Sequence, residues 1–193
     1  MFAAVLDTCV LWPSLQRDFL LSLAAEGIYR PLWSDRILDE LEYCETQKLV
    51  ERGAPAQDAQ HREARLVERM RSAFDDSCVV GWERLEGSFG LPDPNDEHVV
   101  ATSEFANAGA IVTVNITDLP IDHLPPGIGI QTPPEFAHNT VEVSPTGAAV
   151  AVRTLADRSG RLGRRRSPAE ILDDLDRLYA MSDATALIRP LIA

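Results

Sequence analysis

Short apolar runs alternate along the chain with longer segments in which apolar residues recur every three or four positions. The short runs predict strands and the longer segments predict amphipathic helices. The predicted strands cover residues 2–6, 28–31, 78–81, 110–113 and 128–131, and the predicted helices cover 10–25, the segment after Ser34, 57–75 and the segment after Pro94. This alternation is typical of an α/β fold, in which helices flank a central parallel sheet.

After about residue 140 the pattern changes to helices alone. The clearest signal is "SPAEILDDLDRLYAM", where Ser167, Pro168 and Glu170 form a capping box with proline at the first helical position. We therefore predict an α/β domain over residues 1–139 and a C-terminal α-helical extension over residues 140–193.

The composition is that of an ordinary soluble domain, with 45% hydrophobic and 25% charged residues among 193. No stretch approaches the roughly 20 apolar residues that cross a bilayer. The apolar N-terminus lacks a basic start and contains Asp7, so we expect neither a signal peptide nor a membrane anchor. Cys9, Cys44 and Cys78 are widely separated, which fits a reducing, cytoplasmic location.

The net charge of −12 argues against loose, non-specific binding to nucleic acid. Five arginines nevertheless gather in "RSGRLGRRR", namely Arg158, Arg161, Arg164, Arg165 and Arg166. The simpler interpretation is that these arginines lie in a solvated loop between helices. In that case the C-terminal extension only covers a face of the core. The alternative is that these arginines contact RNA phosphates, for which the guanidinium group is well suited.

Two acids follow predicted strands. In an open parallel sheet, ligands bind beyond the carboxyl ends of the strands. Asp7 ends the first strand, and Asp118 follows the strand at 110–113 in the same way. Taken singly, each acid also has a structural explanation, because aspartate commonly caps helices and stabilises turns.

Two further aspartates precede a helix in "LPDPNDEHVVA". With Pro94 at the first helical position, Asp93 is suited to be the N-cap, and Asp96 would favour the positive end of the helix dipole. However, the spacing from Asp96 to Val99 and onward places Asp96 on the face that packs against the sheet. The same spacing turns His98 away from that face, so we expect His98 to be a surface or supporting residue and not a ligand.

A fifth acid, Glu40, lies at the edge of the apolar arc of the helix in "SDRILDELEYC". Glu45 lies in the same arc, and the periodicity alone does not separate the two glutamates. Acids from separate parts of the chain are thus predicted near one edge of the sheet. Clustered carboxylates repel unless a cation lies between them, and all-oxygen ligation favours Mg²⁺ or Mn²⁺. Such a cation activates water against phosphodiesters, which indicates phosphate-ester hydrolysis.

Four blocks in order carry a family likeness: "AVLDTCVLW", "WSDRILDEL", "LPDPNDEHVVATSEFANAGAIVTVNITDLP" and "IGIQTPPEF". Over about residues 2–138 the chain resembles the PIN-domain ribonucleases, and more narrowly the VapC-type toxins of bacterial toxin–antitoxin pairs. The resemblance implies a three-layer α/β/α fold and four catalytic acids, Asp7, Glu40, Asp96 and Asp118. It thereby selects Glu40 over Glu45.

The resemblance also implies which residues bind the metal. The ligands to Mg²⁺ or Mn²⁺ would be Asp7, Asp96 and Asp118, with Asp93 either an additional ligand or only a helix cap. Thr113 and Asn115 would support them from the "TVNITD" block. Many family members have another aspartate where this chain has Asn115, which leaves the number of metal ions open.

The function implied is metal-dependent endonucleolytic cleavage of RNA, such as transfer or ribosomal RNA, leaving a 5′-phosphate. The resemblance further implies a homodimer and an antitoxin partner whose C-terminal arm blocks the acidic groove. Two alternatives stay open: a catalytically inactive PIN module that binds RNA or a protein, and a PIN-like 5′ nuclease acting on DNA. Phosphatases that use a nucleophilic aspartate are disfavoured, because "DTC" lacks the second acid of their DxD signature.

Overall fold

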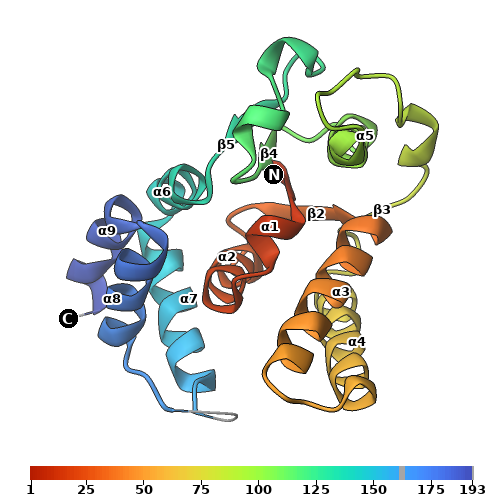
Figure 1. Ribbon diagram of the computed structural model, residues 1–193. Coiled ribbons are helices and arrows are strands. Elements are labelled where there is room, and N and C mark those ends of the chain that lie inside the picture. The colour runs from red at the N-terminus through yellow and green to blue at the C-terminus, as the bar shows by residue number, and fades with distance from the viewer. Residues whose placement is uncertain (161–163, 193) are drawn as a thin grey trace. The chain divides into compact units, whose positions relative to one another are not determined.

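The computed structural model describes residues 1–160 and 164–192. Within these residues, five strands form one sheet in the order β3-β2-β1-β4-β5 (Figure 1). The strands are β1 (Ala3–Leu6), β2 (Arg30–Ser34), β3 (Cys78–Val79), β4 (Ala110–Val112) and β5 (Gly129–Gln131). Strand β1 pairs with β4, and β2 with β3, in parallel. The predicted parallel α/β fold is confirmed.

Helices occupy most of the chain between and after the strands. They are α1 (Thr8–Leu11), α2 (Ser14–Ala25), α3 (Asp35–Glu51), α4 (Ala56–Ala73), α5 (Glu97–Phe105), α6 (Pro133–Val143), α7 (Pro145–Arg158), α8 (Pro168–Tyr179) and α9 (Ser182–Ile192). Short 3₁₀ turns are η1 (Trp82–Leu85), η2 (Pro94–Asp96), η3 (Ile116–Asp118) and η4 (Ile121–His123). No helix within the described residues is both long enough and apolar enough to cross a membrane.

The described chain separates into two compact units. The sheet unit comprises residues 3–12 and 31–130, and the helical unit comprises residues 1–2, 13–30 and those from Gln131 onward. The predicted division at residues 139 and 140 falls within α6 and stays a prediction. All the acids singled out above lie in the sheet unit.

The core of the sheet unit is built on β1 and β4. Ala4, Val5 and Leu6 are fully buried, as are all three residues of β4. Continuous apolar strands of this kind are typical of a parallel sheet whose two faces are both covered. Beside the sheet, α3 and α4 run side by side (Figure 1). Ser34 caps α3 by accepting a hydrogen bond from the Ile37 backbone N–H at 3.3 Å.

The helical unit is held by contacts of α7 with α2, α8 and α9, and of α6 with α9. The predicted capping box of α8 is present, with Ser167 and Glu170 each satisfying a backbone N–H of the other. A second capping box, between Thr132 and Glu135, starts α6, which the periodicity did not predict. The predicted helix over residues 10–25 is two helices, because Pro13 lacks an N–H and disfavours helical geometry before it.

Candidate functional site

Asp7 is anchored at the carboxyl end of β1. Its backbone N–H donates to Val112 O of the neighbouring strand at 3.1 Å. Its Oδ2 accepts hydrogen bonds from Thr113 Oγ1 at 2.7 Å and from the Cys9 thiol at 3.1 Å. Although Asp7 occupies the N-cap position of α1, its side chain makes no capping bond. The carboxylate is therefore oriented by Thr113, which follows β4, and by the Cys9 thiol, and it does not cap the backbone of α1.

The two aspartates of "LPDPNDEHVVA" do different things. Asp93 Oδ1 accepts from the backbone N–H and from the side-chain amide of Asn95, both at 2.9 Å, and so caps η2. Asp96 stands at the N-cap position of α5 without a capping bond. Instead, its Oδ2 accepts from Asn115 Nδ2 at 2.9 Å. The helix α5 begins only at Glu97, so η2 carries the turn that the sequence placed within the helix.

The pKa of Asp96 records how close the acids lie to one another. Burial raises it most, followed by the negative charges of Asp7, Asp93 and Asp118, and the result is a pKa of about 6. His98 opposes this rise. Asp118, half-buried in η3, therefore joins the other three acids within electrostatic reach. Four carboxylates from three segments gather at the end of β1 and β4, and we define Asp7, Asp93, Asp96 and Asp118 as the acid cluster.

Glu40 is held next to this cluster by the residue that follows Asp7. Thr8 Oγ1 donates to Glu40 Oε2 at 2.9 Å, and His98 Nε2 lies 3.3 Å from Oε1. Burial raises the pKa of Glu40, but His98, Thr8 and Arg36 outweigh it and lower the pKa below its ordinary value. Glu45 instead pairs with Lys48 at 2.9 Å. The tertiary structure thus places Glu40, and not Glu45, beside the acid cluster.

The donor set of the acid cluster fits a hard divalent cation. Carboxylate oxygens are the ligands that Mg²⁺ and Mn²⁺ favour, and the raised pKa of Asp96 reflects repulsion that a cation would relieve. The side chains do not already enclose such an ion: in the described part of the chain, no group of three or more His, Cys, Asp or Glu residues has the geometry of a metal site. The fit is therefore one of chemistry and charge.

Comparison with protein families identifies the family of the N-terminal part of the chain. The sequence model described as "PIN domain" matches residues 3–117, which is more than half of the chain. The chain belongs to the PIN domain family. PIN domains are in general nucleases, a class of hydrolases, and typically use divalent metals. Comparisons with curated proteins and with solved structures found no match.

The matched PIN domain contains Asp7, Glu40, Asp93 and Asp96, and ends one residue before Asp118. The two predicted supporting residues of this PIN domain both contact an acid. Thr113 is fully buried, donates to Asp7 and accepts from the Asn115 backbone N–H at 2.9 Å. Asn115 holds Asp96. The loop after β4 thereby connects Asp7 with Asp96 through two adjacent hydrogen-bonding side chains.

Of the two expectations for His98, a surface position or a supporting position, the structure fits the second, because His98 Nε2 lies 3.3 Å from Glu40 Oε1. The alternative of a surface position is wrong, since His98 is only 2% exposed. Its ring packs against Trp82, with ring centroids 6.1 Å apart, because η1 packs against α5. Helical periodicity identifies the face that His98 occupies but does not say that another segment covers it. The "GWERL" stretch, with its large apolar tryptophan, is the one signal that a cover exists.

The sequence pattern did not identify Arg36 as part of the site. Arg36 contacts Glu40, Asn95 and Glu86. Its Nε lies 3.5 Å from Glu40 Oε1, and its Nη2 donates to Asn95 O at 3.4 Å. A third bond goes to the carboxylate of Glu86. Since Asn95 lies between Asp93 and Asp96, one guanidinium ties the segment that carries these acids to the helix that carries Glu40.

The arginines proposed for RNA contact lie in the helical unit or outside the described residues. Arg158 Nη2 donates to Ser22 Oγ at 2.9 Å, and Arg164 pairs with Glu170. Arg166 Nη1 lies 3.5 Å from Asp174 Oδ2. Arg165 is exposed, and Arg161 lies outside the described residues. An RNA-binding role for these side chains stays a prediction.

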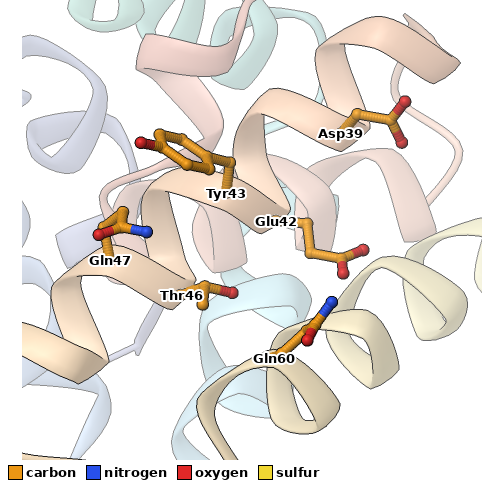
Figure 2. A pocket seen from close by; sticks show the side chains of 6 residues that line it. All are labelled: Asp39, Glu42, Tyr43, Thr46, Gln47 and Gln60. Atoms are coloured by element: carbon orange, nitrogen blue, oxygen red, sulfur yellow. The ribbon is translucent and has the colours of Figure 1, made fainter. Parts of the chain in front are cut away.

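A cavity of about 410 Å³ lies between α3 and α4 and is not lined by the acid cluster (Figure 2). It is lined by Asp39, Glu42, Tyr43, Thr46, Gln47 and Gln60. Figure 2 shows Glu42 and Thr46 pointing toward Gln60, whereas Tyr43 projects to the other side of α3. No acid of the cluster lines this cavity. Its lining offers two carboxylates and neutral groups, which do not favour a phosphate-bearing ligand.

Proposed function

We propose that this protein is an Mg²⁺- or Mn²⁺-dependent endoribonuclease. The observation that carries the proposal is the state of Asp96: a half-buried carboxylate, released from helix capping, whose pKa is raised by burial and by Asp7, Asp93 and Asp118. A chain gains no stability from such an arrangement, and strongly perturbed acids gather at functional sites. Membership of a nuclease family makes phosphodiester hydrolysis the reaction that this site serves best.

In this proposal Asp7, Asp96 and Asp118 hold the cation, and Asp93 adds negative charge beside it while capping η2. When bound, Mg²⁺ or Mn²⁺ supplies Lewis-acid polarisation of the phosphodiester and a water of lowered pKa. The chain's own groups fix the ligands: Thr113 orients Asp7, and Asn115 orients Asp96.

Glu40 has a different part in the proposal. Its lowered pKa keeps it ionised, and its contacts with Thr8, His98 and Arg36 restrict its movement. An ionised carboxylate whose movement is restricted is a good hydrogen-bond acceptor for a water molecule. We assign Glu40 the positioning of the attacking water, since a group with a lowered pKa is a weak proton acceptor.

The choice of RNA and the biological role rest on the resemblance to VapC-type toxins. On that basis the protein is the toxin of a toxin–antitoxin pair, acts as a homodimer in the cytoplasm, and is inhibited by an antitoxin. The acid cluster supports one element of this picture, because it is complementary to a basic side chain from a protein partner.

The direct test is cleavage of total cellular RNA by the purified protein with Mg²⁺, Mn²⁺ or EDTA. We expect discrete fragments that require metal and that disappear in the Asp7→Asn and Asp96→Asn variants. Asp39→Asn is the matched control, because Asp39 is an exposed acid of α3 outside the cluster. Cleavage that persists in EDTA, or in both cluster variants, would refute the proposal.

Parallel assays separate the alternatives. An inactive binding module would bind RNA without cutting it, and a 5′ nuclease would cut flap DNA in preference to RNA. The toxin role predicts that induced expression arrests growth of a bacterial host, whereas Asp96→Asn does not. Cleavage in vitro without growth arrest would support the nuclease activity and refute the toxin role.

A further inference from the structure

One large aromatic side chain of the sheet unit is placed in solvent beside the chain's single lysine. Trp12 is 45% exposed, whereas Trp33 is fully buried and Trp82 is 5% exposed. Lys48, the only lysine in the sequence, places its Nζ 5.5 Å from the centroid of the Trp12 ring. A tryptophan buries a large apolar area when it can, so an exposed indole under a cation suggests a ligand.

The Lys48 ammonium is held over the Trp12 ring by an ion pair. Lys48 Nζ lies 2.9 Å from Glu45 Oε2, and the Glu45 side chain is 7% exposed. Glu45, which the site does not use, thus acquires a role: it fixes the cation over Trp12. The pair forms a preorganised surface with an aromatic ring and an ammonium group whose charge Glu45 partly offsets, so the ring itself is the main feature that a ligand would contact.

Helices α1 and α3 connect the surface formed by Trp12 and Lys48 with the acid cluster. At one end of α1, Thr8 bonds to Glu40, and at the other end Trp12 meets Lys48. Glu40, Cys44 and Lys48 share one face of α3, because residues four apart lie above one another on a helix. Eight residues of helix span about 12 Å. The tryptophan therefore lies on the order of 12 Å from the carboxylate beside the proposed scissile site.

Sequence-tolerant recognition of single-stranded nucleic acid combines aromatic side chains, on which bases stack, with basic groups that follow the backbone. We infer that Trp12 and Lys48 form a subsite that stacks an unpaired base of the RNA substrate. At ~3.4 Å per stacked nucleotide, the base lies roughly three nucleotides from the cut. This inference rests on the proposed function and adds to it that the substrate is single-stranded around the cleavage site.

Tyr43, a large exposed aromatic residue of α3, provides a contrast. Tyr43 is 65% exposed and borders the cavity of Figure 2 together with Asp39 and Glu42. Those carboxylates repel phosphate, so Tyr43 is not suited to the same role. Tyr43→Ala is therefore a matched control for removal of an exposed aromatic from the same part of the molecule.

The first experiment follows tryptophan fluorescence in EDTA, where RNA stays intact. Because Trp33 and Trp82 are buried, a change on adding a short unstructured single-stranded RNA reports mainly on Trp12. We expect quenching by this RNA, and none by an abasic ribose-phosphate chain of the same length or by the duplex form. Equal quenching by the abasic chain would show phosphate contact without stacking and would overturn the inference.

The second experiment measures affinity and kinetics in variants. Trp12→Ala should weaken RNA binding about 5- to 100-fold, the effect of removing one stacked base. The loss should appear as a raised KM with kcat little changed. Trp12→Phe should restore most of the affinity, and Tyr43→Ala should leave it unchanged. A merely structural role for Trp12 would instead lower the melting temperature without this KM effect.

The outcomes separate the inference from the proposed function. If the wild type cleaves RNA with metal and Trp12→Ala matches it in KM and affinity, the subsite is wrong and the nuclease stands. If no cleavage occurs but RNA quenches Trp12 and Trp12→Ala loses affinity, the nuclease is wrong and the base-stacking surface stands as an RNA-binding site.

Discussion

Aspartates at three helix starts show how this chain uses one residue type for two purposes. Asp93 caps its turn through two bonds to Asn95. Asp7 and Asp96 occupy N-cap positions without capping, although such a bond typically contributes about 1 kcal/mol. Their carboxylates are turned instead to Thr113 and Asn115. The two acids that make no capping bond are those that, together with Asp118, we propose to hold the cation.

The raised pKa of Asp96 predicts a pH dependence of stability. The ordinary pKa is 3.8 and the folded value is about 6, so the folded protein binds this proton more tightly than the unfolded chain. The resulting stabilisation is complete below pH 3.8 and is lost as the pH rises through about 6. In EDTA, we expect Asp96→Asn to be more stable than the wild type at pH 7.5, although inactive.

Urea unfolding of both proteins from about pH 5 to pH 8 checks this prediction. The difference in unfolding free energy between variant and wild type should grow through pH 6 in favour of the variant. Addition of Mn²⁺ should reduce that difference by stabilising the wild type. A difference independent of pH would mean that Asp96 does not experience the repulsion described.

At the scale of elements, the loop before η2 is held by one buried carboxylate. Glu97, only 4% exposed, accepts backbone N–H bonds from Phe89 at 3.4 Å, Gly90 at 2.8 Å and Leu91 at 3.3 Å. Burial alone would raise its pKa, but these bonds lower it. The first residue of α5 thus fixes the path of the chain that leads to Asp93.

We predict that Glu97→Ala lowers the unfolding free energy by about 1–3 kcal/mol, because three backbone N–H groups lose their acceptor. Cleavage activity should fall as well, since the loop leads into the segment that carries Asp93. Glu104→Ala, which changes an exposed glutamate of the same helix, is the control. Thermal melts and RNA cleavage by both variants measure the effects. Equal stability of the two variants would show that the loop is held by other contacts.

At the scale of the whole molecule, the net charge of −12 limits how the protein meets RNA. A strongly acidic protein gains little from general attraction to phosphates, so binding depends on few contacts. The ion pairs of Arg164 with Glu170 and of Arg166 with Asp174 reduce the positive charge that the arginine-rich segment offers.

We therefore predict a shallow salt dependence of RNA binding. Each phosphate contact contributes roughly 0.7 to the slope of log K against log salt for single strands. We expect a slope of about 1 or less. The Arg164→Glu/Arg165→Glu variant should leave the slope unchanged. A steep slope that falls in this variant would show that the arginine-rich segment does position RNA, as the alternative interpretation holds.

Local patterns determine much of what this protein is. Alternating apolar runs specify the parallel α/β fold, and the capping box at Ser167 specifies the start of α8. Ordered motifs specify the PIN domain, and the position of Asp7 at a strand end specifies the edge where acids meet. These features rest on residues close in sequence, or on the general rule that the carboxyl ends of parallel strands share one edge.

The tertiary structure alone decided the assignments that depend on neighbours distant in sequence. Periodicity left Glu40 and Glu45 equivalent, and Thr8, 32 residues from Glu40, distinguishes them. It turned His98 away from the sheet and left open whether that residue is exposed or supporting, and the packing of η1 against α5 buries it. Whether Asp96 caps or joins the cluster was settled by Asn115. A helical pattern says which residues share a face, but only the folded chain brings the partner that gives each one its charge state and its role.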